Sequence, residues 1–97
     1  MSVYVDEIQV WAHARGRFKA GSCHLTVDGP IEELHTFALR LGLRLQWFQN
    51  HPLAPHYDLT IGRREAALGL GAVFVPAREQ ARKRMAARAT ARTTEVT

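Results

Sequence analysis

The alternation of apolar and polar positions divides the first half of the chain into two strands and a helix. Val3–Val5 and Cys23–Val27 are short runs of β-forming residues and predict the first two strands. After the turn signal Asp28–Pro30, apolar residues at three- and four-residue spacing predict a helix that ends near residue 41. The apolar face of this helix consists of Ile31, Leu34, Ala38 and Leu41.

The second half predicts two further strands around a second helix. Leu43–Gln49 alternates and is interpreted as the third strand, followed by the proline-containing loop Asn50–Pro55. Thr60 is a good N-cap for a helix that ends near Leu70. Ala72–Val75 is a short apolar run, typical of a buried fourth strand.

This order, β-β-α-β-α-β, predicts a small α/β domain over residues 1–76. Strands that alternate with helices are typical of a parallel sheet, and right-handed crossovers place both helices on one face. The prediction is therefore a single-layer, mostly parallel four-stranded sheet with two packed helices, followed by a C-terminal basic helix.

Residues 77–97 form a tail that carries the whole net charge. The formal charge of the chain is +4, and residues 1–76 hold as many acidic as basic side chains. Ala77–Ala91 is rich in helix formers, and Thr93–Thr97 is predicted to be disordered. The basic helix could contact DNA or RNA phosphates, pair with another copy as a homo-oligomer, or act only as a solubilising extension.

Cysteine usage and the N-terminal sequence bear on location. Cys23 is the only cysteine, whereas secreted domains of this size usually carry several, so a reducing, cytoplasmic compartment is expected. The opening residues contain acidic side chains and no basic segment before an apolar run, which is unlike a signal peptide. The apolar runs are too short to span a membrane, and no membrane partner is expected.

The densest group of chemically active side chains follows the predicted third strand. Parallel sheets bind ligands at the carboxyl ends of their strands, which is where this segment falls. His56 and Asp58 share a face of an extended segment and could bind a divalent metal or act as an acid–base pair. Tyr57 would then position a substrate, and His51 would contribute to binding. The alternative is structural, with Asp58 as a helix cap, His56 bonded to the backbone and Tyr57 packed.

Five other residues are candidates for the site, and the positions of two of them depend on the directions of the strands. Asp6 joins this edge if the first strand is parallel to the others, whereas His24 lies at the opposite end unless the second strand is antiparallel. His35 borders the apolar face of the first helix, where a packed histidine is the favoured interpretation. Arg63 and Arg64 begin the second helix and could hold an anion, or form a solvated pair.

Several segments together resemble a bacterial and phage family, the domain of unknown function 4031. They are VYVDEIQVW, GSCHLTVD, EELHTFALRLGL, WFQNHP, HYDLT, GRREAALGLGAV and VPAREQ, within about residues 2–80. The resemblance implies that the triplet from His56 to Asp58 is the family signature. It also implies that His24 and His35 occupy motif positions and that Arg63 and Arg64 are the paired basic residues after the triplet. It implies no activity.

Two functions remain open at this point. The leading hypothesis is a metal-dependent or acid–base hydrolase acting on nucleic acid or a nucleotide. In it, His56 is a metal ligand or general base, Asp58 a ligand or orienting carboxylate, and His24 and His35 further ligands to a divalent metal. The alternative is a non-catalytic nucleic-acid-binding or protein-interaction module that uses the basic C-terminal helix.

Overall fold

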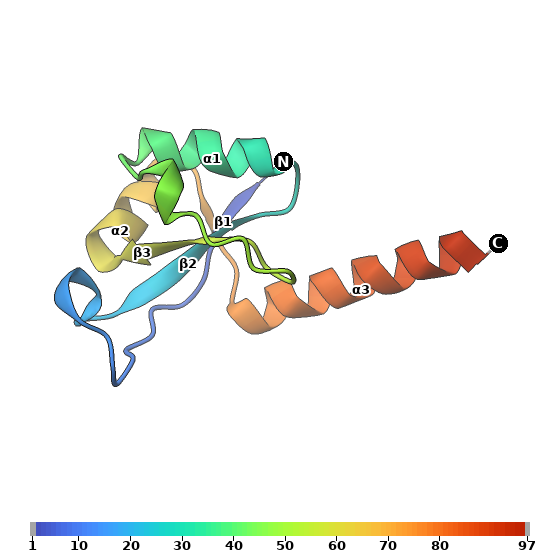
Figure 1. Cartoon of the computed structure of the whole chain (residues 1–97), viewed down its shortest axis with the longest axis horizontal. Helices are drawn as coiled ribbons and strands as arrows, with labels where there is room; N and C mark the ends of the chain where they lie inside the picture. Colours follow the sequence, from blue (N-terminus) through green and yellow to red (C-terminus); the bar gives the residue numbers. More distant parts are fainter. Residues whose placement is uncertain (1, 97) are drawn as a thin grey trace.

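Four short strands form one mixed sheet in the order β3-β2-β1-β4 (Figure 1). The computed structural model describes the backbone of residues 2–96 and the side chains of residues 2–90. Strand β1 is antiparallel to β2, β2 is antiparallel to β3, and β1 is parallel to β4. The strands are β1 (Val3–Val5), β2 (Ser22–Val27), β3 (Tyr57–Thr60) and β4 (Val73–Phe74).

Three α-helices accompany the sheet, with short 3-10 turns in two of the connections. The helices are α1 (Ile31–Arg40), α2 (Ile61–Gly69) and α3 (Ala77–Val96), and the turns are η1 (Gly16–Phe18) and η2 (Leu45–Trp47). Thr60 caps α2 as predicted, because its hydroxyl accepts the backbone N–H of Arg63 at 3.2 Å. Gly42 follows α1 at φ +80°, a conformation that glycine adopts without strain.

The core lies between the sheet and the helices α1 and α2. Side chains alternate across a strand, so every second residue of β2 and β3 points toward the helices. The buried apolar residues include Val5, Cys23, Leu25, Leu34, Phe37, Ala38, Tyr57, Leu59 and Ala67. The other positions, Ser22, His24 and Thr26 of β2 and Asp58 and Thr60 of β3, lie on the opposite side of the sheet. Together with Asp6 and His56, which flank the strands, they form the side here called the polar face.

The predicted third strand is wrong in position. Leu43–Gln49 contains the turn η2, and only Gln49 makes a bridge, by exchanging two backbone hydrogen bonds with His56. The strand is Tyr57–Thr60, a segment that was not predicted to be a strand. Burial explains the difference, because Tyr57 and Leu59 are buried, whereas Leu45 and Trp47 are exposed.

The predicted mostly parallel sheet is also wrong. After α1 the chain returns through residues 43–56 and enters β3 antiparallel to β2, so no parallel crossover joins these two strands. Only β4 pairs in parallel, with β1. Of the run Ala72–Val75, which was predicted to be buried, Ala72 and Val75 are buried. The two paired residues of β4, Val73 and Phe74, are about half exposed, because β4 is an edge strand.

Helix α3 begins on the polar face and then extends away from the rest of the chain (Figure 1). Gln80 is buried; its side chain accepts the hydroxyl of Thr26 at 2.6 Å and donates to the carbonyl of Val75 at 2.8 Å. The helix passes the predicted end near residue 91 and continues to Val96; Thr97, also predicted to be disordered, lies outside the described residues. Within the described residues, no helix has the length and apolar character needed to cross a membrane.

Candidate metal centre

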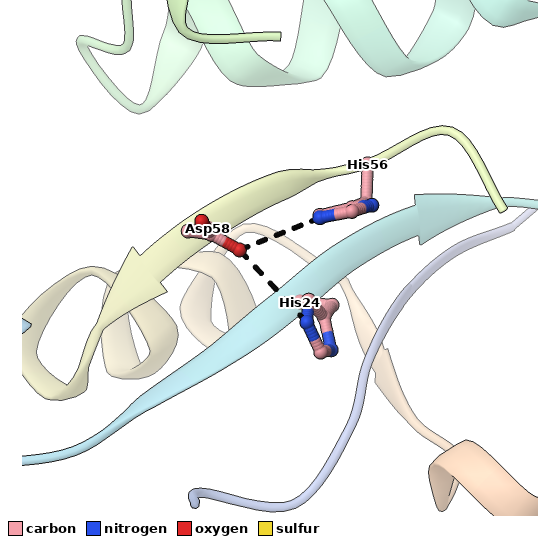
Figure 2. A group of neighbouring side chains, drawn as sticks. All are labelled: His24, His56 and Asp58. Atoms are coloured by element: carbon pink, nitrogen blue, oxygen red, sulfur yellow. Dashed lines mark ion pairs between the residues drawn. The ribbon is translucent and has the colours of Figure 1, made fainter. Parts of the chain in front are cut away.

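The antiparallel pairing of β2 and β3 brings two histidines and an aspartate together. His24 of β2 lies directly opposite Asp58 of β3, and His56 lies two residues before Asp58 on the same face (Figure 2). A parallel sheet would have placed His24 and His56 at opposite ends. The mixed topology therefore creates a cluster that the predicted sheet would have separated.

The spacing of the three side chains is close to that of metal ligands. Asp58 Oδ1 lies 3.5 Å from His56 Nε2 and 3.9 Å from His24 Nε2. One ligand atom from each residue lies within 4.8 Å of the other two. Ligand atoms about 2.1 Å from a tetrahedral ion stand about 3.4 Å apart. Contractions that range from about 0.1 Å to at most about 1.4 Å would therefore complete the site.

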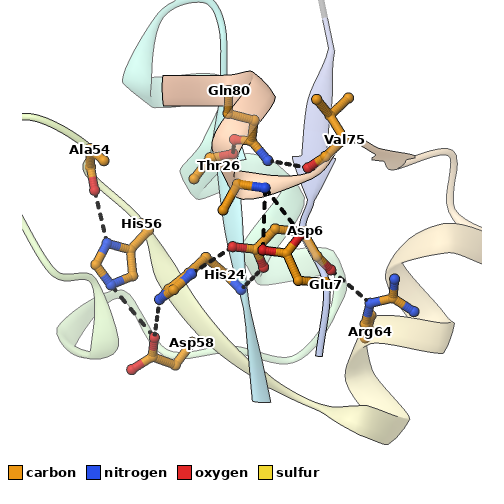
Figure 3. A network of polar contacts seen from close by, with 11 residues as sticks. Asp6, Glu7, His24, Thr26, Ala54, His56, Asp58, Arg64, Val75 and Gln80 are labelled. Carbon is orange, nitrogen blue, oxygen red and sulfur yellow. Dashed lines mark hydrogen bonds and ion pairs between the residues drawn. The ribbon is translucent and has the colours of Figure 1, made fainter. Parts of the chain in front are cut away.

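Hydrogen bonds fix both imidazole rings with the same nitrogen directed at Asp58. His24 Nδ1 lies 2.7 Å from Asp6 Oδ2, and His56 Nδ1 lies 2.8 Å from the carbonyl of Ala54 (Figure 3). Because a carboxylate and a carbonyl only accept hydrogen bonds, each neutral ring carries its hydrogen on Nδ1. Each Nε2 then offers its lone pair to the space beside Asp58 Oδ1.

Asp6 is the residue that orients His24. Its carboxylate is 3% exposed and also accepts the backbone N–H of His24 at 2.6 Å. Arg64 donates from Nε to the carbonyl of Asp6 at 3.0 Å and so supports the backbone where β1 ends. A carboxylate bonded to the outer nitrogen of a histidine ligand is the usual support of a metal site.

Gln49 is a site residue that the sequence did not reveal. Its side-chain amide donates to Asp58 Oδ2, which leaves Oδ1 directed at the two histidines. Gln49 reaches this position through its backbone bridge to His56, which closes the loop of residues 50–55. Only the recognition of residues 49–56 as a hairpin could have predicted from the sequence that Gln49 lies beside Asp58.

Tyr57 and His35 do not join the cluster. Tyr57 is 1% exposed on the core side of β3, where burial raises the pKa of its phenol. His35 of α1 lies with its Nδ1 2.8 Å from the Tyr57 hydroxyl and its ring against Phe48. The structure thus places Tyr57 in the core and the half-buried His35 beside it, on the other side of the sheet from Asp58.

The remaining candidates lie around the cluster. His51 is exposed, and its Nδ1 accepts the backbone N–H of Leu53 at 3.1 Å. Arg63 donates to the carbonyl of Leu41 at 2.8 Å, and Arg64 supports Asp6, so the two arginines have different surroundings.

Three hollows give access to the cluster from solvent. One, of about 360 Å³, is lined by residues that include all three members, His24, His56 and Asp58. A second, of about 320 Å³, includes His24, His51, His56 and Arg84 of α3. The third, of about 290 Å³, includes Gln49 and Asp58. A ligand could therefore approach the space between the two histidines and Asp58.

The Asp6–His24 pair predicts a titration that can be observed directly. The hydrogen bond with Asp6 raises the pKa of His24 above its ordinary value of 6.5, with smaller contributions from the charges of Asp6, Asp58 and Glu7 against the opposing effect of burial. The pair stabilises the metal-free fold fully below the unfolded pKa of His24, and this contribution is lost as the pH rises through the raised, folded pKa. In NMR titrations of the imidazole signals, we expect Asp6→Asn to lower the pKa of His24.

Asp28→Asn is the matched control, because Asp28 bonds Tyr4 and Ser2 instead of a histidine. It should leave the pKa of His24 unchanged. A His24 titration that is the same in the wild-type and Asp6→Asn proteins would contradict the assigned hydrogen bond.

The fold and the site define a small α/β protein with a mixed sheet and a cluster of two histidines and an aspartate on its polar face. The chain belongs to the family described as protein of unknown function (DUF4031), which it matches over residues 3–88. The match extends past residue 80, where the resemblance had been expected to end, and so includes the first turns of α3. Comparisons with curated proteins and with solved structures gave no match.

Proposed function

We propose that this chain binds a divalent transition metal ion through His24, His56 and Asp58 and uses it to hydrolyse phosphate esters of a nucleotide or nucleic acid. One observation carries the proposal. With neutral imidazoles, all three converging atoms are hydrogen-bond acceptors, and each side chain is held in place by a separate bond to Asp6, Ala54 or Gln49. Three converging lone pairs repel one another unless a metal ion, or a proton on one imidazole, lies among them.

The ligand types favour zinc among the available ions. Two imidazole nitrogens and one carboxylate oxygen suit Zn²⁺, Mn²⁺ or Fe²⁺, whereas Mg²⁺ prefers oxygen ligands and retained water. Three protein ligands leave a position for water, and zinc lowers the pKa of such a water to about 7. The hollow lined by all three ligands would admit a substrate to that position.

The residues around the ligands have supporting roles in this proposal. Asp6 fixes the ring of His24 and strengthens it as a ligand, and Gln49 keeps Oδ1 of Asp58 directed inward. Arg84 of α3 and His51 line the hollow next to His24, where a guanidinium group would attract a phosphate ester.

Hydrolysis of two chromogenic esters tests the proposal. The chain, freed of metal and reloaded with Zn²⁺ or Mn²⁺, is assayed with bis(p-nitrophenyl) phosphate and p-nitrophenyl phosphate. We expect metal-dependent release of p-nitrophenol, lowered about 100-fold or more by His56→Ala, as for loss of an essential catalytic group. His13→Ala, which changes an exposed loop histidine, is the matched control. Equal rates for the wild-type and His56→Ala proteins, or for the loaded and metal-free proteins, would refute the hydrolase.

A non-catalytic role in nucleic-acid binding is the second candidate function. The observation that favours it is the projection of α3 away from the domain, with Arg82, Lys83 and Arg88 exposed (Figure 1). Contacts between these side chains and phosphates would be salt-sensitive and independent of the metal ligands. Binding that persists in a His56→Ala protein without hydrolysis would favour this second function.

A further inference from the structure

Three arginines surround one exposed tryptophan beside the metal centre. The guanidinium carbons of Arg17, Arg44 and Arg63 lie 5.4, 5.6 and 5.9 Å from the centre of the Trp47 ring. They come from separate parts of the chain: the turn η1, the residue before η2 and the first turn of α2. Trp47 itself is 36% exposed. The fold therefore gathers three positive charges at one place on the surface.

These charges have little to balance them. Among residues 2–90, whose side chains the structure describes, none of the three arginines forms an ion pair with a carboxylate. Arg63 donates from Nη1 to the carbonyl of Leu41, and Arg17 and Arg44 are exposed. A guanidinium group has five N–H donors, so most of the donors around Trp47 remain available to a ligand. Gathered like charges repel, and a bound anion removes that repulsion.

The hollow that contains Gln49 and Asp58 also reaches Trp47 and two of these arginines. Its volume is about 290 Å³, and its lining includes Arg17, Trp47, Arg63, Gln49 and Asp58. A group bound by Arg17 and Arg63 would therefore lie in the same hollow as the carboxylate that the proposed function assigns to the metal, whereas Arg44 approaches Trp47 from outside the lining of that hollow. The volume is near the lower limit for ligand pockets and suits a phosphate group better than a large ligand.

We infer that Arg17, Arg44 and Arg63, gathered around Trp47, bind a phosphate group. Arginine forks match phosphate oxygens in pairs, and three guanidinium groups suit the two charges and several oxygens of a phosphate better than the single charge of a carboxylate. That the phosphate belongs to the substrate of the metal centre rests on the proposed function.

Trp47 can report this binding directly. The chain has two tryptophans, so Trp11→Phe leaves Trp47 as the only one. This full-length protein, in a chelating buffer without metal, is titrated with inorganic phosphate, adenosine monophosphate, a short single-stranded oligonucleotide and acetate. We expect a saturable change in Trp47 fluorescence with the phosphate compounds and none with acetate. Comparison of the affinities for inorganic phosphate, adenosine monophosphate and the oligonucleotide shows whether the bound phosphate is free or belongs to a nucleotide or a nucleic acid.

Charge-matched variants show whether the cluster is responsible. In the Trp11→Phe background, Arg17→Ala with Arg44→Ala should weaken binding about tenfold or more, since two charge-assisted contacts are lost. These two side chains are exposed, so the fold should persist. Arg40→Ala with Arg78→Ala removes the same charge from exposed positions elsewhere and should leave the affinity unchanged.

The inference is overturned if no phosphate compound gives a saturable change, if acetate gives the same change, or if both double variants lose affinity equally. The absence of metal from the buffer keeps the two proposals separate. Phosphate binding in a chain that fails to bind Zn²⁺ would refute the proposed hydrolase alone. Zinc binding without phosphate binding at Trp47 would refute this inference alone.

Discussion

Replacing His24, His56 or Asp58 with alanine should lower the affinity of the chain for Zn²⁺ by about 100-fold or more, as measured by isothermal titration calorimetry. Each variant removes one of three protein ligands, and the remaining two cannot enclose the ion. The three atoms lie within 4.8 Å of one another, so no other side chain needs to be recruited to complete the site. The loss should be similar for the three residues, since each supplies one ligand.

Variants of the supporting residues should have intermediate effects. Gln49→Ala and Asp6→Asn leave all three ligands but remove the bonds that orient Asp58 and His24, and each should weaken binding about 10- to 100-fold. His13→Ala is the control and should bind Zn²⁺ as tightly as the wild type. Equal affinities for the His24→Ala, His56→Ala and wild-type proteins would exclude the assigned ligands.

Leu34→Ala should destabilise the fold by about 2–5 kcal/mol, because it opens a cavity in the core under α1. Leu34 is 0% exposed, and it lies against the apolar side of the sheet with Leu25 and Tyr57. The free energy of unfolding is measured by urea denaturation, followed by circular dichroism. A small domain has a narrow margin of stability, so a loss of this size would leave a substantial unfolded population.

Leu39→Ala is a matched control on the same helix. Leu39 is 63% exposed, and the same substitution changes helix propensity by the same amount without leaving a cavity. We expect a change within about 0.5 kcal/mol, as for surface substitutions in general. Similar losses for both variants would mean that α1 does not bury the face assigned to it.

The elements that were predicted correctly are those that local sequence determines. The strand at Val3–Val5, the stripe of α1 and the cap at Thr60 depend on neighbouring residues, and the structure confirms them. The third strand failed because Leu43–Gln49 and Tyr57–Thr60 both alternate. Only contact with the core distinguishes the two segments, and that contact depends on the whole fold.

Part of the site could be predicted from the sequence, because local sequence alone determines the relation between two of its residues. His56 and Asp58 are two residues apart, so an extended backbone places them on one face wherever the strand lies. The positions of His24 and Asp6 depend on strand directions, which periodicity does not reveal. The arginines around Trp47 gave no joint signal because residues 17, 44 and 63 meet only through folding.

The proposed metal centre requires that His24 and His56 bind one metal ion together. The most direct test is a titration of the metal-free chain with Zn²⁺, Mn²⁺ and Mg²⁺, followed through the NMR signals of the imidazole rings of its five histidines. Substoichiometric to equimolar Zn²⁺ should shift the signals of His24 and His56 together, while those of His13 and His35 remain unchanged. Paramagnetic Mn²⁺ should broaden the signals of His24 and His56 most strongly, and Mg²⁺ should have no comparable effect. If His24 and His56 do not respond to Zn²⁺, or respond at different concentrations, the metal centre does not exist as described.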